Sequence, residues 1–196
     1  MRRKLSSGAE SMIYLNDDNN IEKDRVVKGY RIKEIDDALR RSRTKKELRI
    51  LKALAKMKFK VPRVIESTDT KIVMEYVDGV QLKKILDDSP SLAEPIGRNL
   101  QLMHESDIIH GDLTTSNMIL KDEIYFIDFG LSFVSKRVED KAVDIHLFKQ
   151  ALESRHYRVH DKAYDYFLKG YNPKNKKEIL ERLKAVESRG RYKERT

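Results

Sequence analysis

The pattern of hydrophobic and polar positions predicts a small antiparallel sheet with one long helix in the first part of the chain. Strand-like runs occur at Leu5–Leu15, where Gly8 marks a tight turn, and at Ile21–Val27 after a polar hairpin loop. A further strand is expected within Lys71–Gly79, running into a turn. Between these strands Asp36–Phe59 is predicted to be helical, because apolar residues recur every three or four positions: Leu48, Ile50, Leu51, Leu54, Ala55 and Met57.

The rest of the chain is predicted to be mainly helical. Ser91 and Glu94 have the spacing of a capping box, and Ile96, Leu100 and Met103 form the expected buried face of the helix that follows. Three further helices are expected at Lys141–Leu152, about Val159–Leu168 and Lys177–Glu187.

A lobe boundary is predicted near Asp78-Gly79, where the strand-like run ends in a turn. Residues 1–78 form one lobe, residues 79–188 a second, and residues 189–196 a basic tail that is too polar to pack. The sequence shows no internal repeat and no low-complexity linker. The expected fold class is α+β.

Composition narrows the possible partners and chemistry. The 196 residues carry a formal net charge of +9, which favours an anionic partner such as nucleotide or nucleic acid. The lack of cysteine excludes disulfides, thiolate metal sites and cysteine nucleophiles. No run of eighteen apolar residues occurs, and Met1-Arg2-Arg3-Lys4 leads into polar residues. We therefore expect a cytoplasmic protein.

Two motifs carry the candidate chemistry. His110–Asn117 reads H-x-D-x-x-x-x-N and Ile127–Gly130 reads I-D-F-G, and their aspartates, Asp112 and Asp128, lie sixteen residues apart. Each motif alone is common by chance. Together, in this order, they indicate transfer of a phosphoryl group from ATP.

A hairpin predicted between the motifs brings their side chains together. Its strands are Met118–Leu120 and Ile124–Ile127, so that Asp128 returns beside Asn117. Amide and carboxylate oxygens suit a hard cation, and we expect Asn117 and Asp128 to bind Mg²⁺. Asp112 is the candidate carboxylate that orients the attacking hydroxyl or water.

Lys23 is the candidate ligand of the ATP α- and β-phosphates. One lysine among 41 basic residues is a weak signal, and its support is its position, one strand after the glycine turn and before the long helix. Glu47 on that helix has two possible partners. It pairs with Arg43 one turn earlier on a solvated face, or it turns inward and pairs with Lys23. We favour the Lys23–Glu47 ion pair.

Backbone groups are the other candidate nucleotide ligands. Gly8, Ala9 and Glu10 are expected to form a turn that covers phosphates with its N–H groups, although one glycine also fits a plain β-turn. Glu75 and Val77 lie where a strand meets a turn between the predicted lobes. They are candidates for binding adenine through backbone groups.

Two charged features leave alternatives open. Asp144, among apolar residues, either holds the backbone of the His110–Asn117 loop or is an ordinary acid of the first helical turn. The window from Leu39 to Lys60 is either a solvated face or a surface for RNA. It holds one acid, Glu47, and ten basic residues: Arg40, Arg41, Arg43, Lys45, Lys46, Arg49, Lys52, Lys56, Lys58 and Lys60.

Over nearly its whole length the chain resembles the small atypical serine/threonine protein kinases of the KEOPS complex (PRPK-type, archaeal-like). The strings HGDLTTSN and IDFGLSF are highly specific to that family. The motifs that carry the resemblance are Gly8–Glu10, Lys28–Arg31, Arg43–Thr44, His110–Asn117, Ile127–Phe133, Glu139–Asp144 and Arg189–Arg191.

The resemblance implies a minimal two-lobed protein-kinase-like fold, with residues 1–78 as the nucleotide-binding lobe and residues 79–188 as a reduced catalytic lobe. It implies autophosphorylation and ATPase activity with ATP and Mg²⁺. It also implies partnership with the KEOPS tRNA threonylcarbamoyltransferase subunit in making threonylcarbamoyladenosine (t6A). Carried over by motif, Lys23 and Glu47 are the ion pair, Asp112 the catalytic carboxylate, and Asn117 and Asp128 the metal ligands.

The chain also departs from ordinary protein kinases. Gly111 replaces the arginine that receives activation-loop phosphate, Glu22 stands before Lys23 where an apolar residue is usual, and no A-P-E segment occurs in the 66 residues after Gly130. We therefore favour an ATPase or a narrowly directed kinase over a general one. One alternative is an aminoglycoside-type small-molecule kinase, for whose acceptor pocket 66 residues leave little room. The other is a silent nucleotide-binding scaffold, which would not need Asp112.

Overall fold

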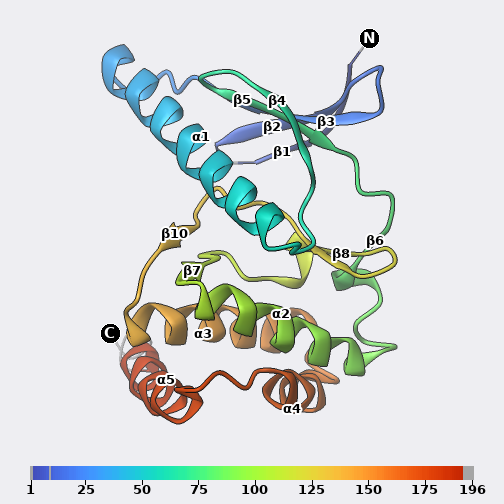
Figure 1. The fold of residues 1–196 in the computed structure, drawn as a ribbon, viewed down its shortest axis with the longest axis vertical. Coiled ribbons are helices and arrows are strands. Elements are labelled where there is room, and N and C mark those ends of the chain that lie inside the picture. Colours follow the sequence, from blue (N-terminus) through green and yellow to red (C-terminus); the bar gives the residue numbers. More distant parts are fainter. Residues whose placement is uncertain (1, 9, 192–196) are drawn as a thin grey trace. The chain divides into compact units, whose positions relative to one another are not determined.

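The computed structural model describes residues 2–8 and 10–191 (Figure 1). The chain divides into two compact units, Met1–Asp78 and Gly79–Thr196. Ala9 and residues 192–196 of the predicted basic tail lie outside the described residues.

The first unit is built on a five-stranded antiparallel sheet in the order β1-β2-β3-β5-β4. Lys23 stands in the middle of the sheet, opposite Ile13 on one neighbouring strand and Ile72 on the other. Strand β4 has no counterpart in the sequence prediction, because it is an edge strand of mixed polarity and mostly exposed. The strands are β1 (Arg3–Ser7), β2 (Ser11–Leu15), β3 (Asn20–Arg25), β4 (Val64–Ser67) and β5 (Lys71–Glu75).

One long helix, α1 (Lys33–Lys56), accompanies the sheet in the first unit (Figure 1). Ile50, Leu51 and Leu54 are buried as predicted, whereas Ala55 and Met57 are exposed. The helix ends before Phe59, where the prediction placed its end, because Lys58 adopts a left-handed conformation with φ of 59°. Phe59 then turns back and its N–H bonds to the carbonyl of Leu54.

The second unit is mainly helical, as predicted. Helix α2 packs against α4, and α3 packs against α5. Ile96, Leu100 and Met103 of α2 are fully buried, together with Phe148 and Phe167 from α3 and α4. The helices are α2 (Ala93–Glu105), α3 (Val138–Arg155), α4 (His160–Gly170) and α5 (Lys176–Arg191) (Figure 1).

Short strands and turns complete the second unit. Strands β8 and β9 form the predicted hairpin, with β6 on the other side of β8, and β7 pairs with β10. The short elements are β6 (Val80–Gln81), the 3-10 turns η1 (Leu82–Lys84), η2 (Pro90–Leu92) and η3 (Thr115–Asn117), and the strands β7 (Ile108–Ile109), β8 (Met118–Leu120), β9 (Ile124–Phe126) and β10 (Phe133–Val134).

Two local predictions in the second unit are wrong. Ser91 lies within the 3-10 turn η2, which makes Leu92 the N-cap of α2, and no side-chain hydrogen bond caps the helix. Helix α5 continues to Arg191, past the expected start of the basic tail, and the Arg189 side chain pairs with Glu139 at 2.7 Å. The tail prediction failed there because this ion pair joins α5 to α3.

None of the helices in the described ranges, 2–8 and 10–191, is long and apolar enough to cross a membrane.

Helices α2 and α4 approach each other through glycine. A Cβ atom at Gly97 would lie 2.2 Å from the carbonyl oxygen of Phe167, and one at Gly170 would lie 2.0 Å from that of Glu94. The contacted atoms are backbone, so a side chain cannot be accommodated without moving a helix.

We expect Gly97→Ala to lower the free energy of unfolding by about 2 kcal/mol, a typical cost of overpacking. Alanine has the higher helix propensity, so the opposite sign would follow if packing were unaffected. Urea denaturation of the variant tests this. Asp165→Ala, at an exposed position of α4, serves as the control and is expected to stay within about 0.5 kcal/mol. An equally stable Gly97→Ala protein would contradict the close helix approach.

Candidate functional site

In the first unit Lys23 and Glu47 form a buried ion pair. Lys23 Nζ lies 2.6 Å from Glu47 Oε1, and their side chains are 6% and 2% exposed. Arg25, two residues along β3 and therefore on the same face, places Nη2 2.5 Å from Glu47 Oε2. Each carboxylate oxygen thus has its own cation. Losing one partner from such a buried group typically costs several kcal/mol.

The alternative pairing of Glu47 with Arg43 is wrong. Arg43 Nη1 contacts Glu10 Oε1 instead. Arg25 was missed by the sequence analysis, although the period of two along a strand could have indicated that it accompanies Lys23.

Gly8 lies in the connection between the antiparallel strands β1 and β2. The N–H of Gly8 donates to the carbonyl of Ser11 at 2.9 Å, so this N–H is already used within the turn. Glu10 accepts a hydrogen bond from the N–H of Val26 through its backbone carbonyl, and its side chain faces arginines. Ala9 lies outside the described residues.

The two hinge candidates differ in their environment. Glu75 ends β5, and its N–H donates to the carbonyl of Arg63 at 2.9 Å, while its carboxylate accepts from the N–H of Arg63 at 3.3 Å. The side chain of Val77 is buried in the first unit. The adenine-binding role of both remains a prediction.

In the second unit the His110–Asn117 loop connects β7 to β8. Gly111 has φ of 78°, and a Cβ there would lie 2.6 Å from the carbonyl oxygen of Leu131, so only glycine fits. The side-chain amide of Asn117 donates from Nδ2 to both the carbonyl and Oδ2 of Asp112, each at 2.9 Å. The loop therefore holds the candidate base against the candidate metal ligand.

The β8–β9 hairpin returns Asp128 toward Asn117. The N–H of Ile127 donates to the carbonyl of Asn117 at 2.9 Å, which ties the end of the hairpin to the loop. Asp128 has φ of 62°, a left-handed conformation that costs a residue with a side chain roughly 1–3 kcal/mol. Its Oδ1 accepts from the N–H of Gly130 at 3.2 Å.

The donors present suit Mg²⁺ bound together with a nucleotide. Nδ2 of Asn117 is committed to Asp112, which leaves Oδ1 of Asn117 as the atom that could ligate a cation together with the carboxylate of Asp128. Among the described residues no group of three or more His, Cys, Asp or Glu side chains is arranged to hold a metal. Mg²⁺ needs no such group, since one or two protein oxygens with water and phosphate oxygens complete its octahedron.

Asp144 holds the loop backbone, which decides between the two alternatives left by the sequence. Its Oδ2 accepts from the N–H of His110 at 2.8 Å and its Oδ1 from the N–H of Gly111 at 2.9 Å. A third bond comes from His104, whose Nε2 lies 3.2 Å from Oδ2. Asp144 is fully buried, and these three donors replace the water that it has lost.

His104 and Tyr171 extend this network and were missed by the sequence analysis. Because a carboxylate only accepts, Nε2 of His104 carries the proton, and Nδ1 accepts from the hydroxyl of Tyr171 at 2.8 Å. Burial raises the pKa of Tyr171, with the charge of Asp144 adding to the effect, so the hydroxyl keeps its proton. No spacing in the sequence signals this contact, since 67 residues separate the two side chains.

A second buried histidine holds the other end of the loop. His156 places Nδ1 2.6 Å from Asp87 Oδ1 and Nε2 2.9 Å from Thr115 Oγ1. Thr115 opens the 3-10 turn that carries Asn117. The loop is therefore held by Asp144 at its start and by His156 near its end.

His110 itself is neutral. It is fully buried against Phe129, with ring centroids 4.9 Å apart, and its Nδ1 accepts from the N–H of Asp112 at 3.3 Å. Its Nε2 is a buried donor with no hydrogen-bond partner among the described residues. Burial lowers the pKa of His110, an effect only partly offset by the carboxylates of Asp144, Asp128 and Asp112.

The fold and this loop define the class as a small protein of the protein-kinase type. The chain resembles Rio2 kinase from Chaetomium thermophilum with a TM-score of 0.66 at 20% identity, over 95% of this chain and 71% of that chain. A second structure of that kinase, an ADP/Mg²⁺-phosphoaspartate complex, gives a TM-score of 0.64 at 18% identity, over 96% and 70% of the two chains. At these identities the likeness shows the fold alone.

The RIO domain family profile matches residues 13–145. The chain is 42% identical to KEOPS complex subunit Bud32 of Pyrococcus abyssi, covering 98% of this chain and 97% of that protein. It is 40% identical to EKC/KEOPS complex subunit BUD32 of Encephalitozoon cuniculi, covering 95% and 94%. The chain therefore belongs to the RIO domain family and, within it, to the family of these KEOPS subunits.

Some relatives are longer. A probable bifunctional tRNA threonylcarbamoyladenosine biosynthesis protein of Methanobrevibacter smithii is 42% identical over 96% of this chain, which spans 36% of that protein. A relative of Methanosarcina acetivorans with the same description is 37% identical, and the chain spans 35% of it. The chain thus corresponds to about a third of each of these bifunctional proteins.

The buried, neutral His110 predicts a pH dependence of stability. The unfolded chain takes up a proton near pH 6.5, whereas folded His110 does so only at lower pH. The free energy of unfolding should therefore fall as the pH drops below about 6.5. His110→Gln, which keeps an acceptor for the Asp112 N–H, should make this fall shallower by up to about 1.4 kcal/mol per pH unit. Urea denaturation between pH 7.5 and 5 measures it.

The control is His160→Gln, at a partly exposed position, which should leave the slope nearly unchanged. An unchanged slope in His110→Gln would assign the pH dependence to other groups.

Proposed function

We propose that the chain is an ATP- and Mg²⁺-dependent phosphotransferase with ATPase activity, acting as the kinase subunit of a KEOPS complex that supports t6A modification of tRNA. Its acceptor is water or a serine or threonine of a partner protein, and the same activity gives autophosphorylation. KEOPS membership is the stated role of the relatives that match this chain over nearly their whole length. A tRNA-modifying role also favours a cytoplasmic protein.

The observation that carries the proposal is the contact between Asn117 and Asp112 beside the Asp128 hairpin. The carboxylate of Asp112 accepts a hydrogen bond from the side-chain amide of Asn117, which lies in the same loop. This bond fixes the carboxylate in a position to orient a hydroxyl or water. Asn117 and Asp128 would hold Mg²⁺ on the ATP phosphates. When bound, the metal supplies neutralisation of the charge that develops on the transferred phosphoryl group.

The first unit supplies phosphate ligands in this proposal. Lys23, which its ion pair with Glu47 holds in position, binds the α- and β-phosphates. Arg25 provides the second cation beside the Glu47 carboxylate. The Gly8–Glu10 turn covers the phosphates, and backbone groups of Glu75 and Val77 bind adenine. This unit would be the nucleotide-binding lobe, and residues 79–188 the reduced catalytic lobe.

We expect Asp128→Ala to abolish Mg²⁺-dependent release or transfer of the γ-phosphate, since half of the protein's metal ligand set is lost. Asp112→Asn should lower turnover by about a hundredfold or more, the usual contribution of a positioned base. The measurement follows γ-labelled phosphate from ATP with the protein alone, with the tRNA-modifying partner, and with partner and tRNA. Asp165→Ala removes an exposed carboxylate of α4 and should turn over normally.

The destination of the label separates the reactions. Inorganic phosphate that increases with partner and tRNA indicates an ATPase that drives modification, while label on the partner indicates a directed kinase. Turnover by a folded Asp128→Ala protein at the normal rate would refute the site.

We also propose that the exposed face of α1, with the C-terminal basic residues, contacts tRNA. Lys45, Lys46 and Lys52 are exposed and form no ion pair with any described residue, so their charge is available to a polyanion. Reversing all three to Glu should weaken tRNA binding and make log K less dependent on log salt, by roughly 0.7–0.9 for each phosphate that is no longer neutralised. Filter binding at several salt concentrations measures both.

The matched control reverses Lys162, Lys174 and Lys177, which are exposed lysines of the second unit and change the net charge equally. If both triple variants behave alike, the α1 face is merely solvated and total charge explains the binding.

A further inference from the structure

The first unit contains a cavity whose walls are strongly cationic. Five basic side chains and one carboxylate, that of Glu10, line it, with Val26 and Leu39 completing the wall. The five basic residues come from β3, the loop after it and α1: Arg25, Lys28, Arg31, Arg40 and Arg43. Nothing in the proposed phosphotransfer uses Lys28, Arg31, Arg40 or Arg43.

Carboxylates outside the cavity lining hold three of these arginines in place. Arg31 Nη1 lies 3.4 Å from Asp36 Oδ1. Arg40 donates from Nε to Asp36 Oδ2 at 2.9 Å and from Nη2 to Asp37 Oδ1 at 2.5 Å. Arg25 is held by Glu47 at 2.5 Å. Asp36 and Glu47 are each only 1% exposed, and neither is among the residues that line the cavity. The cations are thus pre-organised before any ligand arrives.

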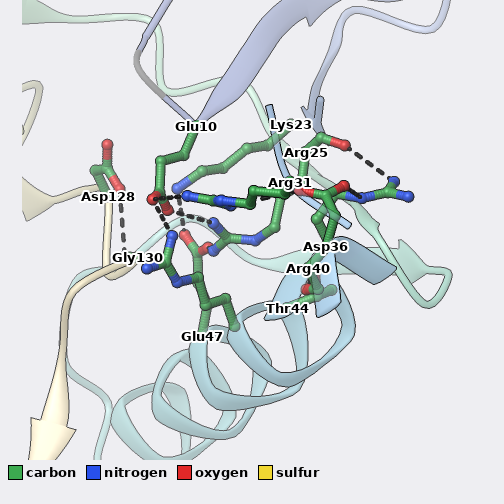
Figure 2. Close-up of polar contacts among 11 residues, drawn as sticks. Glu10, Lys23, Arg25, Arg31, Asp36, Arg40, Thr44, Glu47, Asp128 and Gly130 are labelled. Carbon is green, nitrogen blue, oxygen red and sulfur yellow. Dashed lines mark hydrogen bonds and ion pairs between the residues drawn. The ribbon is translucent and has the colours of Figure 1, made fainter. Parts of the chain in front are cut away.

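Glu10 lines the cavity, but its carboxylate does not form close contacts with all of the arginines around it (Figure 2). Its Oε1 contacts Arg43 closely, but the same oxygen is 4.0 Å from Arg31 Nη2, and its Oε2 is 3.9 Å from Arg25 Nη1. The last two distances exceed the length of a hydrogen bond. Of the three guanidinium groups around the Glu10 carboxylate, only that of Arg43 contacts it closely. Arg25 and Arg31 pair with Glu47 and Asp36 through other nitrogens, and the nitrogens that face Glu10 are left without a hydrogen bond to it.

We propose that this cavity binds a phosphate dianion, free or carried as a phosphomonoester on a side chain, in place of the Glu10 carboxylate. A tetrahedral phosphate offers three or four oxygens and two charges, and guanidinium groups bind such oxygens through paired hydrogen bonds. Lys28, which is half-buried and forms no ion pair with a described residue, adds a further cation to the cavity wall. The cavity shares Glu10 and Arg25 with the proposed nucleotide-binding lobe, whereas Lys28, Arg31, Arg40 and Arg43 have no part in the proposed ATP chemistry.

Exchange of Glu10 for phosphate requires little rearrangement. The backbone carbonyl of Glu10 stays bonded to the N–H of Val26, so only the side chain has to move. That side chain is 34% exposed and can turn to solvent. The resulting site regulates the position of the Glu10 carboxylate, because the phosphate and the carboxylate compete for Arg43 and Arg31.

The test titrates the full chain with inorganic phosphate and with O-phosphoserine at about pH 8, where both are dianions, at constant ionic strength. Binding is followed by NMR through the Nε–H signals of arginine and by calorimetry. We expect the signals of Arg31 and Arg43 to move with one common Kd. Dimethyl phosphate, a monoanion that stands for a nucleic-acid diester, should bind at least about tenfold more weakly. The tighter of the two dianions identifies the source, free or side-chain phosphate.

Two variants with opposite expected effects on phosphate affinity test whether the phosphate binds in this cavity. Arg43→Gln should weaken phosphate binding about tenfold, as expected for loss of one charge-assisted bond. Glu10→Gln should strengthen it several-fold, because the competing carboxylate is gone. Two matched controls change charge on the exposed surface of the same unit: Lys45→Gln for the arginine, and Glu66→Gln for the acid. Neither should alter the Kd by more than about twofold.

The proposal is overturned if phosphate binding survives Arg43→Gln unchanged, or if Glu66→Gln strengthens it as much as Glu10→Gln. Circular dichroism confirms that each variant is folded. ATP turnover is measured separately, so loss of phosphate binding with normal turnover supports this site without touching the proposed function.

Discussion

The two hydrogen bonds from the backbone of His110 and Gly111 to the carboxylate of Asp144 carry the geometry of the second unit. The positive φ of Gly111 turns successive N–H groups toward one point, where no water can serve them. A neutral acceptor could take these bonds, but a carboxylate makes them charge-assisted and therefore stronger. Asp112 follows immediately in the chain, so the fixed backbone of His110 and Gly111 determines the direction of its carboxylate. Asn117 is then held relative to Asp112 rather than independently.

Glu47 shows the complementary arrangement in the first unit. Its partners, Lys23 and Arg25, are formal cations, so the buried charges largely cancel. The partners of Asp144 are neutral donors, and its charge is therefore felt by its surroundings. It raises the pKa of Tyr171, as burial also does, and it opposes the lowering of the His110 pKa by burial. The charge of Glu47 is thus balanced by its own partners, whereas the charge of Asp144 shifts the pKa values of its neighbours.

Local patterns predicted the elements that carry these acids, while contacts between distant residues were not predictable. The β8–β9 hairpin follows from two apolar runs on either side of a polar turn, and the inward face of α2 from the helical repeat. The Lys23–Glu47 contact was expected because Lys23 follows the glycine turn and precedes the long helix that carries Glu47, and because the family resemblance implies the pair. His104 and His156 gave no signal, since each is a single buried histidine whose partners come from other segments. The capping box failed because Ser91 lies inside a 3-10 turn that a spacing rule does not see.

The left-handed backbone of Asp128 sets a conflict between folding and chemistry. Glycine would adopt φ of 62° without steric cost, but it would lose the hydrogen bond that Asp128 Oδ1 accepts from the N–H of Gly130. The chain keeps aspartate there and bears the strain as part of its folding free energy. Under the proposed function the carboxylate offsets this strain by binding Mg²⁺, so relatives that have lost turnover would be free to replace it. The identity of this one residue therefore serves as a diagnostic for separating active chains of this fold from relatives that have become scaffolds.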